Sequence, residues 1–162
     1  MLDTVDHRRG KRLRGEETFE DLALGDWFKT AGRTVTEADV VGFAALTWDR
    51  NPAHTDAVHA ANSIFGERVA QGMLGLSYAL GLVPSSTILA LRRLKHVVFK
   101  APILFGDTIH VEGYVTGLQP YSDEVGLLTG RWKVLKDDGS VAVKMEIDAL
   151  IRRRNANDAL DD

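Results

Sequence analysis

The spacing of apolar positions changes along the chain, and these changes predict where helices and strands lie. Between residues 36 and 48, apolar side chains recur every three to four positions, which is the spacing of one helical face. Thr36, followed by the acidic Glu37 and Asp39, is typical of a helix N-cap. We therefore predict a helix from about residue 36 to Trp48, which delivers the chain to Asp49.

A second apolar segment follows, and the pattern then becomes that of strands. Residues 73–83 are apolar on nearly every side, which predicts a buried helix that begins near Gly72 and ends before Pro84. Further on, apolar and β-branched residues alternate in four expected strands, after a first one at residues 27–35: 94–100, 108–116, 125–134 and 141–152. Strands in series after a buried helix indicate an α+β fold, in which an antiparallel sheet wraps its concave face around that helix.

Composition places the chain among ordinary folded proteins of one domain. Of the 162 residues, 44% are hydrophobic and 27% are charged. We expect a flexible basic N-terminal tail at residues 1–18, a folded domain at residues 19–153 and a polar C-terminal tail at residues 154–162. A formal net charge of −3 gives no general reason to expect nucleic-acid binding, and we interpret the basic residues 7–14 as a solvated tail rather than a nucleic-acid arm.

The same numbers bear on compartment. The chain has no cysteine, no apolar run of about 18 residues that would span a membrane, and no apolar segment typical of a signal peptide. We expect a cytoplasmic protein with neither a membrane nor a nucleic acid as partner.

Residues 49–54 hold the strongest candidate chemistry. Asp49 and His54 form a natural acid/base pair near neutral pH, and Asn51 can orient the pair through its side-chain amide. We expect Pro52 to stop the preceding helix and to stiffen a loop at residues 49–54. Spacing alone leaves an ordinary Asx turn open as well. One histidine with Asp49 and Asp56 nearby is a thin ligand set for zinc, so we expect no metal.

Gly72 is the second candidate. A helix N-terminus presents unpaired N–H groups, and glycine lets a substrate oxygen approach them, so the backbone N–H of Gly72 is a candidate oxyanion donor. A role in tight helix entry alone is equally compatible with the sequence. The other histidines, at positions 7, 59, 96 and 110, are expected to be surface or structural residues.

The motif Asp49-x-Asn51-Pro52-x-His54, followed by Phe65 and by Gly72-Met73-Leu74 at the start of an apolar helix, resembles the MaoC-like family and its R-specific enoyl-CoA hydratases. Phe19-Glu20-Asp21-Leu22 with Gly25-Asp26, and the stretch from Val98 to Thr108, are also similar to that family. The resemblance covers residues 19 to 152, about the whole chain outside the expected tails.

The resemblance implies a hot-dog fold and a homodimer that binds an acyl-CoA thioester near the subunit interface, with coenzyme A as part of the substrate and no separate cofactor. It further implies that Asp49 and His54 activate a water for syn addition to a trans-2-enoyl thioester, which gives an R-3-hydroxyacyl product, while Gly72 polarises the carbonyl. Gln71 and Leu80 depart from residues that family members often carry, so acyl length stays open. An acyl-CoA thioesterase and a non-catalytic acyl-CoA-binding regulator are the alternatives.

Overall fold

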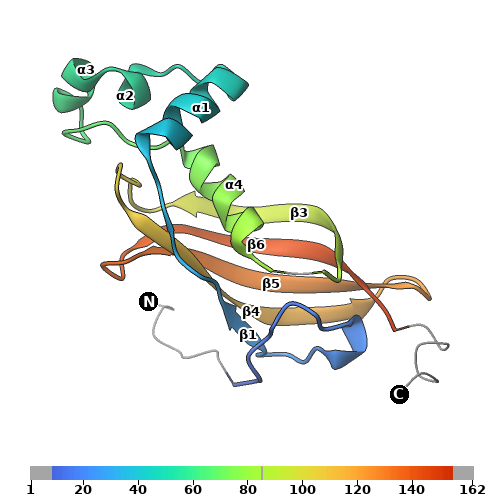
Figure 1. The fold of residues 1–162 in the computed structure, drawn as a ribbon. Helices are drawn as coiled ribbons and strands as arrows, with labels where there is room; N and C mark the ends of the chain where they lie inside the picture. The colour runs from blue at the N-terminus through green and yellow to red at the C-terminus, as the bar shows by residue number, and fades with distance from the viewer. Residues whose placement is uncertain (1–8, 85, 155–162) are drawn as a thin grey trace.

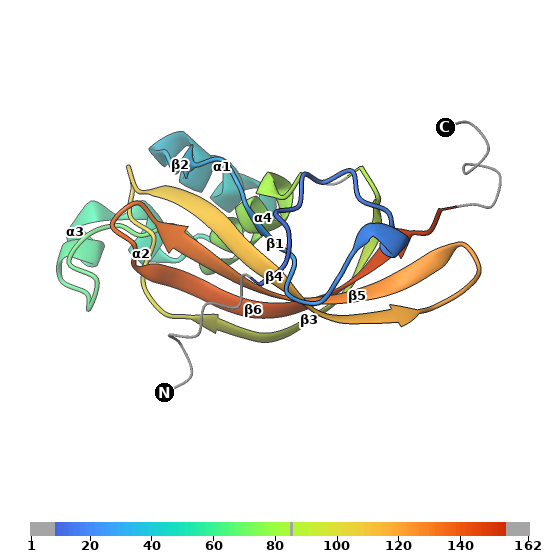
Figure 2. The same ribbon diagram turned by 90° about the horizontal axis from the view of Figure 1, so that it is seen from below.

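The structure, a computed structural model, describes residues 9–84 and 86–154, and its main element is one antiparallel sheet (Figure 1). The hydrogen-bonded order of the strands is β1-β4-β5-β6-β3, and β2 pairs with β4 at one end. The strands are β1 (Trp27–Lys29), β2 (Arg33–Thr34), β3 (Ile88–Phe99), β4 (Thr108–Pro120), β5 (Val125–Lys136) and β6 (Val141–Arg152). The long strands β3 to β6 are curved, which gives the sheet a concave face (Figure 2).

Helix α4 (Gly72–Leu82) lies against that concave face, and the buried core fills the space between them (Figures 1 and 2). Alternate residues of β6, among them Met145, Ile147 and Ala149, point to the helix and are buried. Leu74, Leu76 and Ala79 of α4 meet the sheet side of this core. The α+β architecture with a sheet around a helix is therefore confirmed.

Three further helices form a lobe beyond the sheet, next to the first turn of α4 (Figure 1). They are α1 (Glu37–Thr47), α2 (Pro52–Thr55) and α3 (Ala57–Ala61). The N-cap prediction for α1 is confirmed, since the Thr36 side chain accepts from the Asp39 N–H and the Asp39 carboxylate accepts in turn from Thr36. None of the helices within residues 9–84 and 86–154 is long and apolar enough to cross a membrane.

Several boundaries differ from the sequence predictions. The expected strand at 27–35 is interrupted, because residues 30–32 leave the ladder between β1 and β2. Strand β3 begins at Ile88 rather than at 94. The expected loop at residues 49–54 is shorter, because Pro52 is the first residue of helix α2. Proline suits this position, since it lacks the N–H that the first residue of a helix leaves unpaired anyway.

Helix α4 is less buried than its apolar sequence suggested. Met73, Ser77 and Gly81, spaced four residues apart, are exposed on one face. Beside it, edge strand β3 exposes further apolar side chains at fractions between 44% and 51%: Leu89, Leu91, Val98 and Phe99. The prediction of full burial was wrong for this face of a single chain.

Residues 10–18, which we call the N-terminal strap, lie along the outer edge of β1. The Leu13 N–H donates to the Trp27 carbonyl and the Trp27 N–H to the Lys11 carbonyl, so the strap pairs with the strand in parallel. The Arg12 guanidinium stacks on the Trp27 ring. The strap thus covers an edge that would otherwise expose unpaired backbone groups. Residues 1–8, the rest of the expected tail, and 155–162 lie outside the described residues.

Candidate functional site

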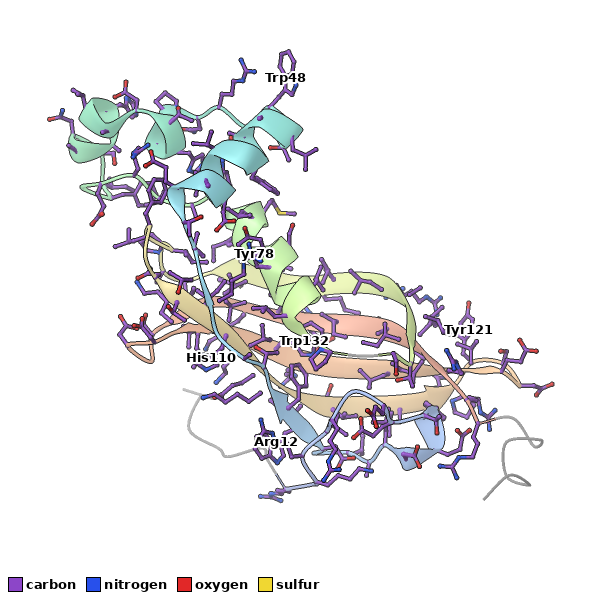
Figure 3. The ribbon with its side chains drawn as sticks, viewed as in Figure 1. Arg12, Trp48, Tyr78, His110, Tyr121 and Trp132 are labelled. Carbon is purple, nitrogen blue, oxygen red and sulfur yellow. The ribbon has the colours of Figure 1, made fainter. Side chains whose placement is uncertain are left out.

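The turn after α1 sets the position of Asp49. Trp48 caps the helix in the left-handed region, with φ 64° and ψ 13°, and its N–H still donates to the Ala44 carbonyl. A bulky residue rarely adopts this conformation, which helices normally reserve for glycine. The Trp48 ring points away from the molecule at the tip of the helical lobe (Figure 3). The chain therefore turns sharply and presents Asp49 at the start of the candidate loop.

Asn51 and Pro52 then build the short helix that carries His54. The Asn51 side-chain oxygen accepts from the Ala53 N–H at 2.9 Å, so Asn51 is the N-cap of α2. Pro52 occupies the first helical position. The Asn51 carbonyl also accepts from the His54 backbone N–H at 2.9 Å, so Asn51 acts on the position of His54 through the short helix that it caps.

Asp49 and His54 face each other, and the contact is held in place by the backbone. The His54 Nδ1 lies 2.7 Å from the carbonyl oxygen of Val69, which can only accept, so Nδ1 carries the proton. The other ring nitrogen, Nε2, therefore faces the Asp49 carboxylate at 3.9 Å. His54 is mostly buried, with 13% of its side chain exposed, whereas Asp49 is 46% exposed.

A separation of 3.9 Å is too long for a direct hydrogen bond but fits one water between the two groups. A water about 2.8 Å from each group can donate a hydrogen to the Asp49 carboxylate and accept one from His54 Nε2 when that nitrogen also carries a proton. Donation to the carboxylate raises the electron density on the water oxygen. The pair can therefore position and activate a single nucleophilic water.

Gly72 opens α4 close to this pair. The Val69 N–H donates to the Ala53 carbonyl, and the Val69 carbonyl contacts the His54 ring. Both backbone groups of Val69, in the segment that leads into α4, are therefore bonded to α2. Gly72 follows Val69 by three residues, a reach of at most about 11 Å. As the first residue of α4, Gly72 has an N–H outside the helical ladder and at the positive end of the helix dipole.

Gln71 fixes the start of α4 relative to α1. Its side chain is 1% exposed and donates through Nε2 to the Val40 carbonyl at 3.2 Å. Helix α1, which precedes Asp49, and helix α4, which begins at Gly72, are thus joined by one buried amide. Its Oε1 has no hydrogen-bond partner within the described part of the chain.

Basic residues near the sheet do not converge on this site. Lys95 contacts the carboxylates of Asp148 and Glu146 at 2.9 Å and 3.3 Å, and Arg92 stacks on Tyr121. Burial acts to raise the pKa of Asp148, but the Lys95 ammonium and the Thr129 hydroxyl outweigh it and lower that pKa. Lys95 therefore belongs to an ion-pair network on the sheet. Among the described residues, no cluster of three or more His, Cys, Asp or Glu could hold a metal ion.

Sequence reasoning missed two contributors. The Val69 carbonyl fixes the orientation of the His54 ring. Every residue has a backbone carbonyl, so no residue type in the sequence indicates this contact. Gln71 was noted only as a departure from the family pattern, although a polar residue before a buried helix is a signal that could have been followed.

Comparisons with known proteins agree with this picture. Residues 21–134 match the family model for the MaoC like domain. The chain is 39% identical to an (R)-specific enoyl-CoA hydratase from Rhodospirillum rubrum over 63% of this chain and 72% of that protein. It is 43% identical to protein MaoC from Klebsiella aerogenes over 57% of this chain, but the match spans only 29% of that relative.

A solved structure agrees over more of the chain. A protein described as a monoamine oxidase regulatory protein from Archaeoglobus fulgius superposes with a TM-score of 0.80 at 36% identity, and the match covers 88% of this chain and 98% of that one.

A curved antiparallel sheet wrapped around one helix is the hot-dog fold, and it carries the candidate pair Asp49 and His54. The chain belongs to the MaoC-like family. Both the fold class and the family that the sequence motif implied are therefore confirmed.

Proposed function

We propose that this protein is an enoyl-CoA hydratase, or 3-hydroxyacyl-CoA dehydratase in the reverse direction, and that Asp49 and His54 are its catalytic pair. The observation that carries the proposal is the 3.9 Å approach of His54 Nε2 to the Asp49 carboxylate, with Nδ1 bonded to Val69. The named activity of the relative from Rhodospirillum rubrum supports it.

In this mechanism one water O–H bond breaks, its proton goes to Asp49, and the oxygen bonds to C3 of the trans-2-enoyl thioester. The C2–C3 double bond becomes a single bond, and C2 takes its proton from the His54 Nε2–H. Negative charge that builds on the thioester oxygen meets the Gly72 N–H. Transfer of a proton from Asp49 to His54 restores the pair, and delivery from one side gives syn addition and the R-3-hydroxyacyl product.

The test is the identity of the product. Purified protein is mixed with trans-2-enoyl-CoA, and loss of enoyl absorbance is recorded together with free thiol. We expect loss of absorbance, no thiol release, and oxidation of the product only by an R-specific 3-hydroxyacyl dehydrogenase. Release of thiol without hydration would instead identify a thioesterase, and ligand binding without either reaction would identify a regulator.

We further propose that two copies of the chain form a homodimer through β3 and the exposed face of α4. Strand β3 is the last strand of the sheet in the part of the chain that the structure describes, and its half-exposed apolar side chains form a surface that favours pairing. A Cβ on Gly72 would lie 3.0 Å from the exposed ring of Phe99, so this apolar surface reaches the candidate oxyanion donor. The substrate site would then lie beside the interface.

The state of assembly is measured by sedimentation of the wild type and of Leu91→Lys. We expect a dimer for the wild type and a monomer for the variant, because a buried unpaired charge opposes association. Leu24→Lys, at a leucine that is 65% exposed in a different part of the chain, is the matched control and should remain dimeric. A wild type that sediments as a monomer would exclude the dimer.

A further inference from the structure

Gln71 contributes to the candidate site through its main chain and through its side chain. The peptide unit between Gln71 and Gly72 carries both the Gln71 carbonyl and the Gly72 N–H, and these two groups point in opposite directions within one plane. The Gln71 carbonyl accepts from the N–H groups of Leu74 and Gly75 at 3.0 and 3.3 Å. Because these bonds fix the carbonyl, they also fix the direction of the candidate oxyanion donor.

The side chain of Gln71 ties the same peptide unit to α1. It donates through Nε2 to the Val40 carbonyl at 3.2 Å, and Gln71 and Val40 are 1% and 0% exposed. This bond holds the Cα–Cβ direction of Gln71, whereas the carbonyl bonds hold the rotation about its ψ, which is 136°. The orientation of the Gly72 N–H relative to α1 is therefore fixed at two points.

Helix α1 is a firm support for this anchor. The Arg68 guanidinium contacts the Glu37 carboxylate at 2.7 Å, and the Tyr78 hydroxyl donates to the Asp39 carboxylate. Both carboxylates belong to the first turn of α1, beside Val40, and Tyr78 reaches that turn from α4, below α1 in Figure 3. The start of α1 is thus held on either side of the carbonyl that Gln71 contacts.

The amide of Gln71 has a cost that packing alone does not explain. Its Oε1 is buried and has no hydrogen-bond partner within the described part of the chain, and burial of an unpartnered acceptor costs about 1–3 kcal/mol. The Val40 carbonyl does not need the side chain, because a carbonyl inside a helix accepts from the N–H four residues later. Stability alone therefore favours an apolar residue of similar size, such as methionine, at position 71.

We propose that Gln71 is a positioning residue for the Gly72 N–H, which sets the direction of this donor relative to α1 and hence to Asp49. The proposal rests on the proposed function, in which the Gly72 N–H meets the negative charge on the thioester oxygen. A donor stabilises that charge best when it is already aimed at the place where the charge develops. Because the charge builds up only in the transition state, the effect of Gln71 falls on kcat rather than on KM.

The first experiment measures kcat, KM and Tm of wild type, Gln71→Met and Gln71→His with trans-2-butenoyl-CoA. Gln71→Met keeps the size of the side chain and removes both polar groups. We expect an equal or higher Tm, an unchanged KM and a kcat that is about 10²-fold lower, the loss that a small misplacement of a reacting group causes. Gln71→His keeps an N–H donor for the Val40 carbonyl and should recover most of that kcat.

The control for this experiment is Gln119→Met, at the only other glutamine of the chain, which is exposed. It should match the wild type in kcat, KM and Tm. A wild-type kcat in Gln71→Met would overturn the proposal, since it would show that Gln71 only fills space. A loss confined to KM would overturn it as well.

The second experiment needs no turnover. Butyryl-CoA labelled with carbon-13 at the thioester carbonyl is bound to each protein, and the stretching frequency of that carbonyl is recorded by infrared difference spectroscopy. A hydrogen bond from the Gly72 N–H polarises the carbonyl and lowers this frequency. We expect the lowered frequency in the wild type and in Asp49→Asn, and a frequency closer to that of free butyryl-CoA in Gln71→Met.

The outcomes separate this proposal from the proposed reaction. A wild-type carbonyl at the free frequency would overturn the positioning role, and this measurement does not depend on the folding of any variant. Equal lowering in wild type and Gln71→Met, with hydration intact, would refute the positioning role alone. Lowering that is lost in Gln71→Met, without hydration of any enoyl-CoA by the wild type, would support the positioning role and refute the proposed reaction.

Discussion

Asp49→Asn and His54→Gln, made singly and together, form a double-mutant cycle that asks whether the two groups act on one water. Asparagine keeps the shape of Asp49 and removes its basicity. Glutamine keeps an N–H donor that can reach the Val69 carbonyl, which avoids an unpaired buried acceptor. Each variant therefore removes proton transfer and leaves the local hydrogen bonds nearly intact.

The magnitude follows from the geometry of the pair. Loss of a positioned general acid or base lowers the rate by about 10²–10⁴, or roughly 3–5 kcal/mol of transition-state stabilisation. In the proposed mechanism the two groups, whose Nε2 and carboxylate are 3.9 Å apart, contact the same water, so losing either one disables the unit. We expect the double variant to be about as slow as the slower single variant. Independent groups would instead multiply their effects to about 10⁴–10⁸.

The assay is kcat/KM for hydration of a trans-2-enoyl-CoA, read from enoyl absorbance, with thermal unfolding of each variant alongside. Asp56→Asn is the matched control, because asparagine is as good an N-cap for α3 as the aspartate is. It should retain wild-type activity. Multiplicative losses in the double variant, or wild-type activity in either single variant, would refute the shared-water mechanism.

Three further predictions concern stability. Asp148→Ala removes the buried carboxylate that holds Lys95 and should cost about 2 kcal/mol, or roughly 4–8 °C in Tm by calorimetry, while Asp148→Asn should cost less; equal Tm values for wild type and Asp148→Ala would contradict this. The Tyr78 hydroxyl and the capping bonds hold the pKa of Asp39 well below its usual range, so Asp39 stabilises the fold above about pH 4 and loses that contribution as pH falls further. Urea unfolding should therefore show a wild-type advantage over Asp39→Asn that is constant at neutral pH and shrinks below about pH 4, and an advantage that grows in acid would be inconsistent with this sign. Trp48→Gly should leave stability within about 1 kcal/mol, because relief of the left-handed strain offsets the entropy of glycine, whereas Trp48→Val should destabilise, and similar Tm values for the two would argue against strain at this turn.

Much of the fold could be predicted from local patterns. Thr36 and Asp39 gave the start of α1 because capping is a local hydrogen-bond pattern, and the alternation in β4 to β6 reflects one buried and one exposed face. The start of β3 was missed because Leu89, Leu91 and Arg92 are all exposed, which removes the alternation that a half-buried strand shows. An edge strand whose successive side chains are all exposed has no such pattern.

Pro52 was correctly identified as a helix boundary, but it marks the start of α2 rather than the end of the preceding helix. Proline disfavours the helical region for the residue before it, and that effect does separate Asn51 from α2. The same ring favours the first turn of the next helix. Both effects act here, and together they place Asn51 as a cap and bring His54 to the third position of a new helix.

The identities of Asp49 and His54 followed from the motif, but their relation to α4 did not. The ring of His54 is oriented by the Val69 carbonyl, and the residues that follow Val69 lead directly into Gly72. This hydrogen bond thus links the candidate acid/base pair to the segment that leads to the candidate oxyanion donor. Because the bond is made by the main chain, it constrains the path of residues 69–72 rather than the side chain at position 69, and only the three-dimensional structure records it.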